Sequence, residues 1–431
     1  MSYRVLIAAV FLLCSTSATQ LGAAQPADES DPTQQFYRER QGDLAWSGGV
    51  KAIAQAREAL VVLSRSASEG LDPERYRVFR MGDDTRAYDL SLTKAVLTYM
   101  RDVSEGRQDL RSVDADVGLP AQSKNFAAML DKALRQGRLT EMLDGLPPRH
   151  PAYIALRAAL PRSGDKSEIV AANMERWRWL PAVLEPDRIV VNAAESQLEL
   201  WLGDNRVLTS RVIVGRPTQP TPILRAEGAA VTFNPSWTVP HSIAAKEILP
   251  KLKRNHAWLV GHDMVLLNGP PGDPHGLQIN WKAVRMGTFP YQIRQYPGPR
   301  NPLGRIKLEL PNKFQVYLHD TPDKALFNKS KRQLSHGCVR VEQIVPLASY
   351  MLTGDFSTTD KITKAIESGE TITMPAQKKL PVYFLYWTAV PGSDGALKYV
   401  SDVYGRDRRL IAAMHSKQLR IASIDAPCLK G

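Results

Sequence analysis

Apolar residues recur every three or four positions along the N-terminal third of the chain, which is the period of helices that bury one face. In residues 51–68 these positions are Ile53, Ala56, Leu60, Leu63 and Ala67. The same spacing returns in residues 90–103, 127–134 and 154–160. We therefore expect an all-helical domain over residues 36–165, and we interpret it as a structural scaffold.

The pattern changes beyond Pro181 to short runs of β-branched and alternating apolar residues separated by turn residues. Such runs occupy residues 190–191, 198–202 and 207–214, and they return at 306–310 and 314–318. They predict a mainly-β domain over residues 187–363.

Residues 242–295 interrupt this β pattern. They contain a helical stretch and a segment rich in Gly and Pro. A long insertion of this kind in a β domain is usually a lid or a binding loop. We expect a capping insertion of helix and loop here, and a C-terminal extension over residues 364–431 that packs on the β domain.

The first 24 residues have the pattern of a secretory signal peptide: Arg4, an apolar run over 5–13, and small residues at 22–24. The apolar run is too short to span a bilayer. We expect a disordered segment over residues 25–35, an exported protein, and no transmembrane segment once the signal is removed. An uncleaved anchor and lipid attachment at Cys14 remain as alternatives.

The charge balance narrows the class of partner. The chain has 431 residues, 56 Lys plus Arg against 44 Asp plus Glu, and a formal net charge of +12. Hydrophobic residues make up 43% of it, as in ordinary globular proteins. Export argues against a nucleic-acid partner, so an anionic polymer of the cell envelope or a basic surface without a partner accounts for the charge.

Three cysteines, at positions 14, 338 and 428, are too few for a disulfide scaffold, and neither they nor the histidines have a metal-binding spacing. Cys338 lies in the segment 335–340, which reads Ser-His-Gly-Cys-Val-Arg, and His319 ends a predicted strand upstream. A cysteine nucleophile needs a base and backbone N–H groups that stabilise an oxyanion. These residues can supply both, although the spacing does not choose between His319 and His336 as the base. A disulfide between Cys338 and Cys428 is the structural alternative.

The segment 335–340, with a histidine upstream, resembles the catalytic motif of the L,D-transpeptidases with a YkuD-type domain. Further segments resemble the YcbB-like branch of that family, which has an N-terminal scaffold domain. They are residues 37–76, 234–240, 295–304, 386–389 and 402–405.

This resemblance implies a role for each matching residue. Cys338 would be the nucleophile and His319 the proton donor and acceptor. Five residues would support the site: Ser335, His336, Gly337, Arg340 and Asp320. For Asp320, capping of the following Thr-Pro turn is an equal alternative. Tyr317 and Asn301 would contact substrate, and Trp281 would either line a peptide groove or pack the core of the insertion.

The implied reaction is cross-linking of peptidoglycan. Cys338 would form a thioester with a tetrapeptide stem, release D-alanine, and pass the acyl group to the side-chain amine of a diamino acid on another stem. Attack by a thiolate requires no metal or organic cofactor. The resemblance also implies acylation of Cys338 by carbapenems. A hydrolase or protein-attaching enzyme of the same fold, and a wall-binding scaffold without activity, are the alternatives.

Overall fold

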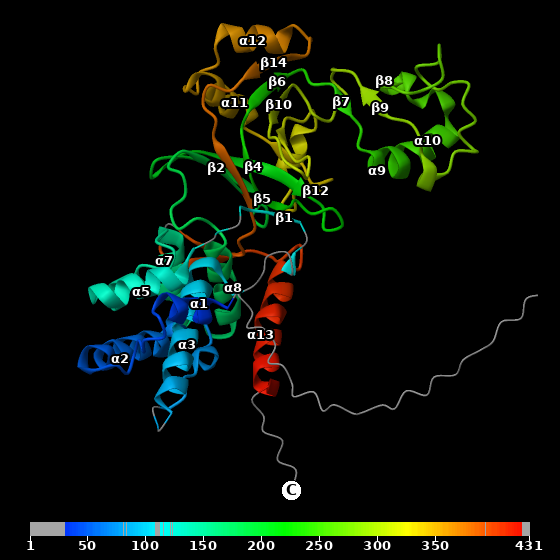
Figure 1. Cartoon of the computed structure of the whole chain (residues 1–431). Helices are drawn as coiled ribbons and strands as arrows, with labels where there is room; N and C mark the ends of the chain where they lie inside the picture. The colour runs from blue at the N-terminus through cyan, green and yellow to red at the C-terminus, as the bar shows by residue number, and fades with distance from the viewer. Residues whose placement is uncertain are drawn as a thin grey trace, which may run out of the picture.

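The computed structural model describes residues 31–424 apart from Met81, Asp83, residues 108–112, Ala115, Ala121, Ser123 and Ser393. It places a group of helices below a large sheet and a smaller lobe beside that sheet (Figure 1). The predicted signal peptide, Cys14 and Cys428 lie outside the described residues.

The N-terminal helices pack around one apolar core that includes Phe36, Trp46, Leu92 and Met100. Asp89 fixes the connection after the first helix, because its carboxylate accepts hydrogen bonds from the backbone N–H groups of Ala45 and Trp46 at 2.7 and 2.9 Å. The helices are α1 (Pro32–Glu39), α2 (Val50–Ser64), α3 (Thr85–Glu105), α5 (Phe126–Gln136) and α6 (Leu139–Asp144).

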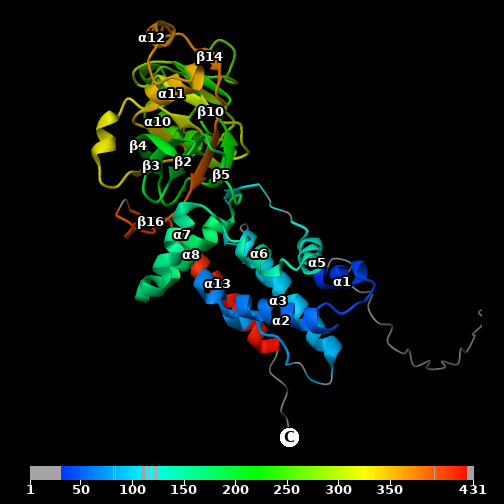
Figure 2. The same cartoon turned by 90° about the vertical axis from the view of Figure 1, so that its left-hand side faces the viewer.

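Three further helices belong to the core of the sheet domain. They are α7 (Pro151–Ala159), α8 (Ser167–Arg178) and α13 (Arg406–Ile424), and α13 lies beside α8 (Figures 1 and 2). Tyr153 and Leu156 of α7 are fully buried in that core. The predicted scaffold boundary at residue 165 therefore falls within helices that share the hydrophobic core of the next domain.

The main sheet has twelve strands, in the order β1-β5-β15-β2-β3-β4-β13-β11-β10-β6-β14, with β12 paired to β4. Their bounds are β1 (Val117–Gly118), β2 (Arg188–Asn192), β3 (Gln197–Leu202), β4 (Asn205–Gly215), β5 (Ile223–Glu227), β6 (Ala230–Phe233), β10 (Ile306–Glu309), β11 (Leu318–His319), β12 (Gln333–Ser335), β13 (Val339–Val341), β14 (Ile372–Pro375) and β15 (Pro381–Leu385). Helix α11 (Ile344–Thr353) packs against β6 and β10, and α12 (Asp360–Glu367) follows it in the chain. The mainly-β fold predicted for this part of the chain is confirmed.

The capping insertion forms the lobe beside the sheet (Figure 1). It contains α9 (His241–Ile243), the π-helical turn η5 (Ala244–Ile248) and α10 (Leu249–Arg254), with a small sheet of β7 (Trp237–Thr238), β8 (Met264–Leu266) and β9 (Ile293–Gln295). Trp281 lies at the centre of its separate apolar core. The insertion therefore folds around a core of its own.

The remaining elements are short. They are the hairpin β16 (Ala389–Pro391) and β17 (Leu397–Tyr399), and the 3-10 turns η1 (Ser66–Glu69), η2 (Pro73–Tyr76), η3 (Leu160–Arg162), η4 (Gly164–Lys166), η6 (His256–Trp258), η7 (Val260–His262), η8 (Met286–Thr288) and η9 (Lys324–Asn328). Within the described part of the chain, no helix has both the length and the apolarity needed to cross a bilayer.

The structure corrects three expectations about elements. Residues 32–35 belong to α1 rather than to a disordered segment, because Asp31 caps this helix and Pro32 starts it. The predicted strand over 314–318 is reduced to β11, since Gln315 has a φ of 55° and breaks the extended backbone. The C-terminal extension does more than pack on the domain: β14 and β15 are strands of the main sheet.

Candidate active site

Three neighbouring strands bring the predicted catalytic residues together. Parallel strands β11 and β13 pair His319 with Arg340, and the antiparallel pairing of β10 with β11 places Lys307 on the other side of His319. Because alternate residues of a strand face the same side, Tyr317 shares the face of His319, and Cys338 shares the face of Arg340. The apolar residues between them, Leu318 and Val339, face the opposite side and are fully buried in the core.

The loop that carries Cys338 is held by hydrogen bonds on both sides. Gly337 has a φ of 114°, a conformation that side chains with a Cβ rarely adopt. The Ser335 hydroxyl accepts from the Gly337 N–H at 3.1 Å and donates to the Cys338 carbonyl at 2.5 Å. The Thr221 hydroxyl donates to the Gly337 carbonyl at 2.8 Å. The conformation of the residue before the sulfur is thus fixed from two directions.

The Cys338 thiol lies in a mostly buried position, 3.7 Å from the Gln315 carbonyl oxygen. Burial raises the pKa of this thiol, while hydrogen bonding with Tyr317 and the charges of Lys307 and Arg340 lower it in part. The shift remains upward, so the resting sulfur is protonated near neutral pH. Attack by this sulfur then requires a base beside it.

His319 is 4% exposed. Burial, and after it the charge of Arg340, lowers the pKa of its ring to about 3. The backbone of Asp320 and of Pro302 partly offsets this shift, although Nδ1 makes no hydrogen bond of normal geometry within the described part of the chain. The ring is therefore neutral near pH 7 and able to accept a proton.

Tyr317 and Arg340 complete the surroundings of the thiol. The Tyr317 ring lies 5.6 Å from the His319 ring, and burial raises the pKa of its hydroxyl, which stays protonated. Such a hydroxyl can donate to a thiolate. Burial lowers the pKa of Arg340, while the charges of Asp323 and Cys338 raise it in part.

Asp320 and Asn301 hold loops beside the site. The Asp320 carboxylate accepts from the Arg305 N–H at 2.8 Å and pairs with Lys324. Asn301 is 1% exposed, and its side chain bonds to the backbone of Pro235, Tyr296 and Leu303. This corrects the expectation of a direct substrate contact for Asn301, because internal partners already occupy its amide group.

His336 and Trp281 lie toward the capping insertion. His336 Nε2 is 2.6 Å from a carboxylate oxygen of Glu247, which also pairs with Arg216 at 3.1 Å. This contact joins the cysteine loop to the π-helical turn of the insertion. Trp281 is fully buried, and its indole N–H donates to the Gly276 carbonyl at 2.8 Å, so it packs the insertion core rather than lining a groove.

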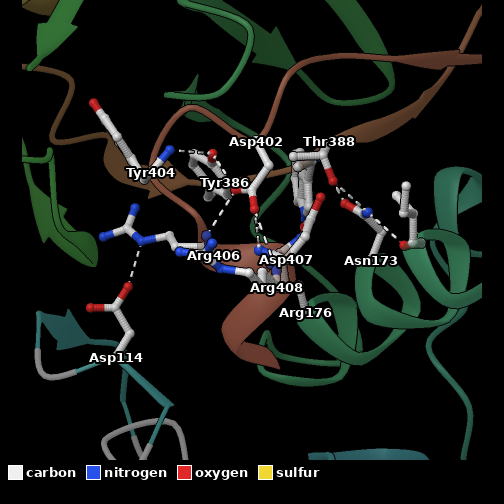
Figure 3. Close-up of polar contacts among 12 residues, drawn as sticks. Asp114, Asn173, Arg176, Tyr386, Thr388, Asp402, Tyr404, Arg406, Asp407 and Arg408 are labelled. Carbon is white, nitrogen blue, oxygen red and sulfur yellow. Dashed lines mark hydrogen bonds and ion pairs between the residues drawn. The ribbon is translucent and has the colours of Figure 1, made fainter. Parts of the chain in front are cut away.

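A network from the C-terminal extension reaches the cysteine loop through Thr221. The Arg406 guanidinium donates to the Thr221 carbonyl at 3.1 Å and pairs with Asp114, and the Tyr404 hydroxyl donates to the Gly215 carbonyl at 2.6 Å. Asp402 accepts from the Arg406 N–H at 2.8 Å and so orders this segment (Figure 3). The cysteine loop thus depends on residues far away in the sequence.

Sequence reasoning missed Thr221, Glu247, Lys307 and Glu309 as neighbours of the site. A signal existed for Lys307 and Glu309, since charged residues alternate with apolar ones in the strand predicted over 306–310. Such alternation indicates a polar face that a fully buried strand lacks. For Thr221 the sequence offers no comparable signal.

The described residues contain no group of three or more His, Cys, Asp or Glu side chains arranged to hold a metal ion. The free cysteine among them is Cys338.

Comparison with known proteins gives one match in the N-terminal helices and another in the sheet domain. Residues 31–160 match the model of the scaffold domain, and residues 186–363 match the model of the YkuD L,D-transpeptidase catalytic domain. A Haemophilus influenzae (strain Rd) protein named "Putative L,D-transpeptidase" is 30% identical over 284 residues, which cover 64% of this chain and 57% of that relative.

Among solved structures, one described as "Structure of the Ldtfm-avibactam carbamoyl enzyme" is similar over 48% of this chain and 51% of that chain, with 13% identity and a TM-score of 0.23. The two domain matches carry the assignment. The chain therefore contains a scaffold domain followed by a YkuD L,D-transpeptidase catalytic domain, which is the YcbB-like arrangement.

Proposed function

We propose that this protein is an exported L,D-transpeptidase that cross-links peptidoglycan stem peptides in the periplasm, with Cys338 as nucleophile and His319 as proton acceptor and donor. The observation that carries the proposal is that His319 on β11 and Cys338, the residue before β13, share one face of these adjacent strands. A protonated thiol beside a neutral imidazole is the resting state from which a base-assisted attack can start.

In the first half-reaction, Cys338 Sγ attacks the carbonyl carbon of the diamino acid in a tetrapeptide stem, and the thiol proton passes to His319. The bond to the terminal D-alanine breaks, and His319 returns the proton to the leaving amine. The products are a thioester on Cys338 and free D-alanine. The Tyr317 hydroxyl stabilises the thiolate as it forms.

In the second half-reaction, the side-chain amine of a diamino acid on another stem attacks the thioester carbon. His319 accepts a proton from this amine, the carbon–sulfur bond breaks, and the proton returns to Cys338. The new amide bond links two third-position residues. Water in place of the amine gives hydrolysis of the thioester.

The test is release of D-alanine from a disaccharide tetrapeptide, with mass analysis of the products in the presence and absence of an amine acceptor. The wild type should release D-alanine and form the dimer, Cys338→Ala should release none, and His319→Asn should be slower by about 100-fold or more. Cys428→Ala and His415→Asn serve as controls and should act as wild type.

Two results would contradict the proposal. Hydrolysed stems without any dimer would make the protein a carboxypeptidase. Binding to peptidoglycan without release of D-alanine, unchanged in Cys338→Ala, would make it a wall-binding scaffold.

A further inference from the structure

A pocket of about 440 Å³ lies where helices α2, α6 and α7 meet. These helices are below the main sheet, whereas Cys338 precedes a strand of that sheet (Figure 1). All residues that line the pocket come from α2, η1, α3, α6 and α7, and the cysteine loop contributes none. The pocket is therefore separate from the candidate active site, and its volume is sufficient for a small ligand.

The pocket contains a buried tyrosine hydroxyl that lacks a hydrogen-bond partner. Tyr99 of α3 lines the pocket, is 4% exposed, and forms no hydrogen bond through its hydroxyl with any described residue. Burial, and after it the charge of Glu69, raises the pKa of this hydroxyl, and the charges of Asp144 and Arg157 also act on it. These three charged residues line the same pocket, so the hydroxyl faces it. An acceptor on a ligand would supply the partner that this O–H group lacks.

Three arginines also line the pocket and can bind a negatively charged group. Arg157 is 42% exposed at its side chain, and its Nη1 atom donates to Glu69 at 2.9 Å. Arg57 and Arg65 lie about two turns apart on α2, are exposed, and form no ion pair with any residue that the structure describes. Since a guanidinium has five N–H donors, all three arginines can donate to a ligand carboxylate.

The other lining residues restrict the kind of anion that fits. Glu58, Glu69 and Asp144 line the pocket together with the three arginines, so the formal charges of the lining cancel. A polyanion would meet like charges here, which is unfavourable. Val61 and Val62 add apolar surface against which methyl groups can pack. A short peptide with carboxylates, an amine and small apolar side chains therefore matches this lining.

We propose that this pocket is a second binding site for the peptide stems of peptidoglycan, in which Tyr99 and the neighbouring arginines bind a stem carboxylate. The inference rests on the proposed function for the identity of the peptide and adds a binding site to it. One polymer carries many stems, so one stem can occupy this pocket while another reaches Cys338. Such bivalent contact raises the effective concentration of stems at the active site.

The test is photolabelling of the Cys338→Ala variant, which cannot turn over, with a disaccharide tetrapeptide that carries a diazirine. Mass spectrometry after digestion identifies the labelled segments. We expect one labelled region around position 338 and a second within residues 54–69 or 140–157. The same probe with all its carboxylates converted to carboxamides should label the second region about tenfold less, the loss of a hydrogen bond to a charged group.

The variant Tyr99→Phe, made in the same Cys338→Ala background, removes the hydroxyl without breaking a hydrogen bond among the described residues. The probe concentration for half-maximal labelling of the second region should rise about tenfold. Arg65→Gln, at an exposed side chain, should raise it in the same direction. Tyr88→Phe is the matched control, because Tyr88 lies on the same helix, is 5% exposed, has no hydroxyl partner among the described residues, and does not line the pocket.

Three results would overturn the second site and leave the transpeptidase proposal intact. They are labelling confined to the region around position 338, equal labelling of the second region in Tyr99→Phe and Tyr88→Phe, and equal labelling of it by the carboxamide probe. Labelling of the second region by the tetrapeptide probe, with no D-alanine release by the wild type, would keep the binding site and overturn the proposed reaction.

Discussion

The Cys338 and His319 side chains differ from a pre-ionised thiolate–imidazolium pair. Burial raises the pKa of the thiol and lowers that of the ring to about 3, so both groups are neutral at pH 7. Proton transfer must accompany the attack on the substrate rather than precede it. This gives the reaction a specific dependence on pH.

We expect the first-turnover rate of D-alanine release to be flat between pH 5 and 8. The active ring is the neutral one, and it is lost only as the pH falls through a pKa of about 3. An exposed histidine would instead lose activity near its ordinary pKa of about 6.5. Quenched-flow assays of D-alanine release between pH 5 and 8 measure this pH–rate profile. A decline centred near pH 6.5, with the protein still folded by circular dichroism, would contradict the neutral pair.

The variant Tyr317→Phe tests the hydrogen bond between the Tyr317 hydroxyl and the Cys338 sulfur. The Tyr317 hydroxyl lowers the pKa of Cys338 through hydrogen bonding, so its removal should raise that pKa further. We expect alkylation by iodoacetamide at pH 8 to slow by about tenfold, the effect of one hydrogen bond to a charged group. Tyr296→Phe, at a residue that is 52% exposed, is the control and should react at the wild-type rate. Equal alkylation rates in Tyr317→Phe and wild type would show that the Tyr317 hydroxyl does not affect the Cys338 thiol.

At the scale of single residues, the sequence identifies site residues that lie within one motif better than site residues that come from separate strands. The segment 335–340 and the upstream histidine were recognisable because their order along the chain is fixed. The neighbours Lys307 and Thr221 depend on strand register and loop contact, which the pattern of the sequence does not specify. A motif does not show whether a polar or aromatic residue is buried, so substrate contact was expected for Asn301 and the role of Trp281 stayed open between a groove and the core.

Among the elements, the loop before Cys338 is positioned by the segment around Thr221 and by the C-terminal extension that holds that segment. Strands β14 and β15 lie in the segment predicted only as a C-terminal extension, and their place in the main sheet follows from long-range pairing. The amphipathic helices were predicted because their periodicity is local. Helix α1 was missed because its polar N-terminal residues resemble those of a disordered segment.

Thr221→Val should slow catalysis through the loop rather than through substrate binding. It removes the hydroxyl that donates to the Gly337 carbonyl at 2.8 Å and accepts from the Gly215 N–H at 2.9 Å, while keeping the size of the side chain. We expect kcat for D-alanine release to fall by about tenfold, with KM for the donor changed by less than about twofold. Thr353→Val, on α11, is the matched control. Unchanged kcat in Thr221→Val would show that the loop holds its shape without this contact.

At the scale of the whole molecule, a buried polar cluster joins the N-terminal helices to the sheet domain. Arg178 is fully buried, pairs with Glu175 at 2.9 Å, and donates to the Tyr153 hydroxyl at 2.9 Å and to the carbonyl of Glu69. Glu69 in turn accepts from Tyr153 at 2.6 Å. The N-terminal helices and the sheet domain are therefore connected by charged and polar side chains, and Arg178 among them is fully buried.

Arg178→Met should lower the free energy of unfolding by about 3–5 kcal/mol, because it removes the nearer of two cations from the buried Glu175 carboxylate, while Arg107 lies at 3.6 Å. Urea denaturation followed by tryptophan fluorescence measures this change. Arg206→Met, which removes a pair with Glu199 at a side chain that is 51% exposed, should change it by less than about 1 kcal/mol. Equal stability of the two variants would contradict the structural role assigned to the cluster.

The most direct test of the central claim is intact-mass spectrometry of the protein after incubation with a carbapenem, beside Cys338→Ala and His319→Ala. The account predicts one covalent adduct on the wild type, its absence in Cys338→Ala, and slower formation in His319→Ala. A folded wild type with a titratable thiol and no adduct would contradict the assignment of Cys338 as the nucleophile.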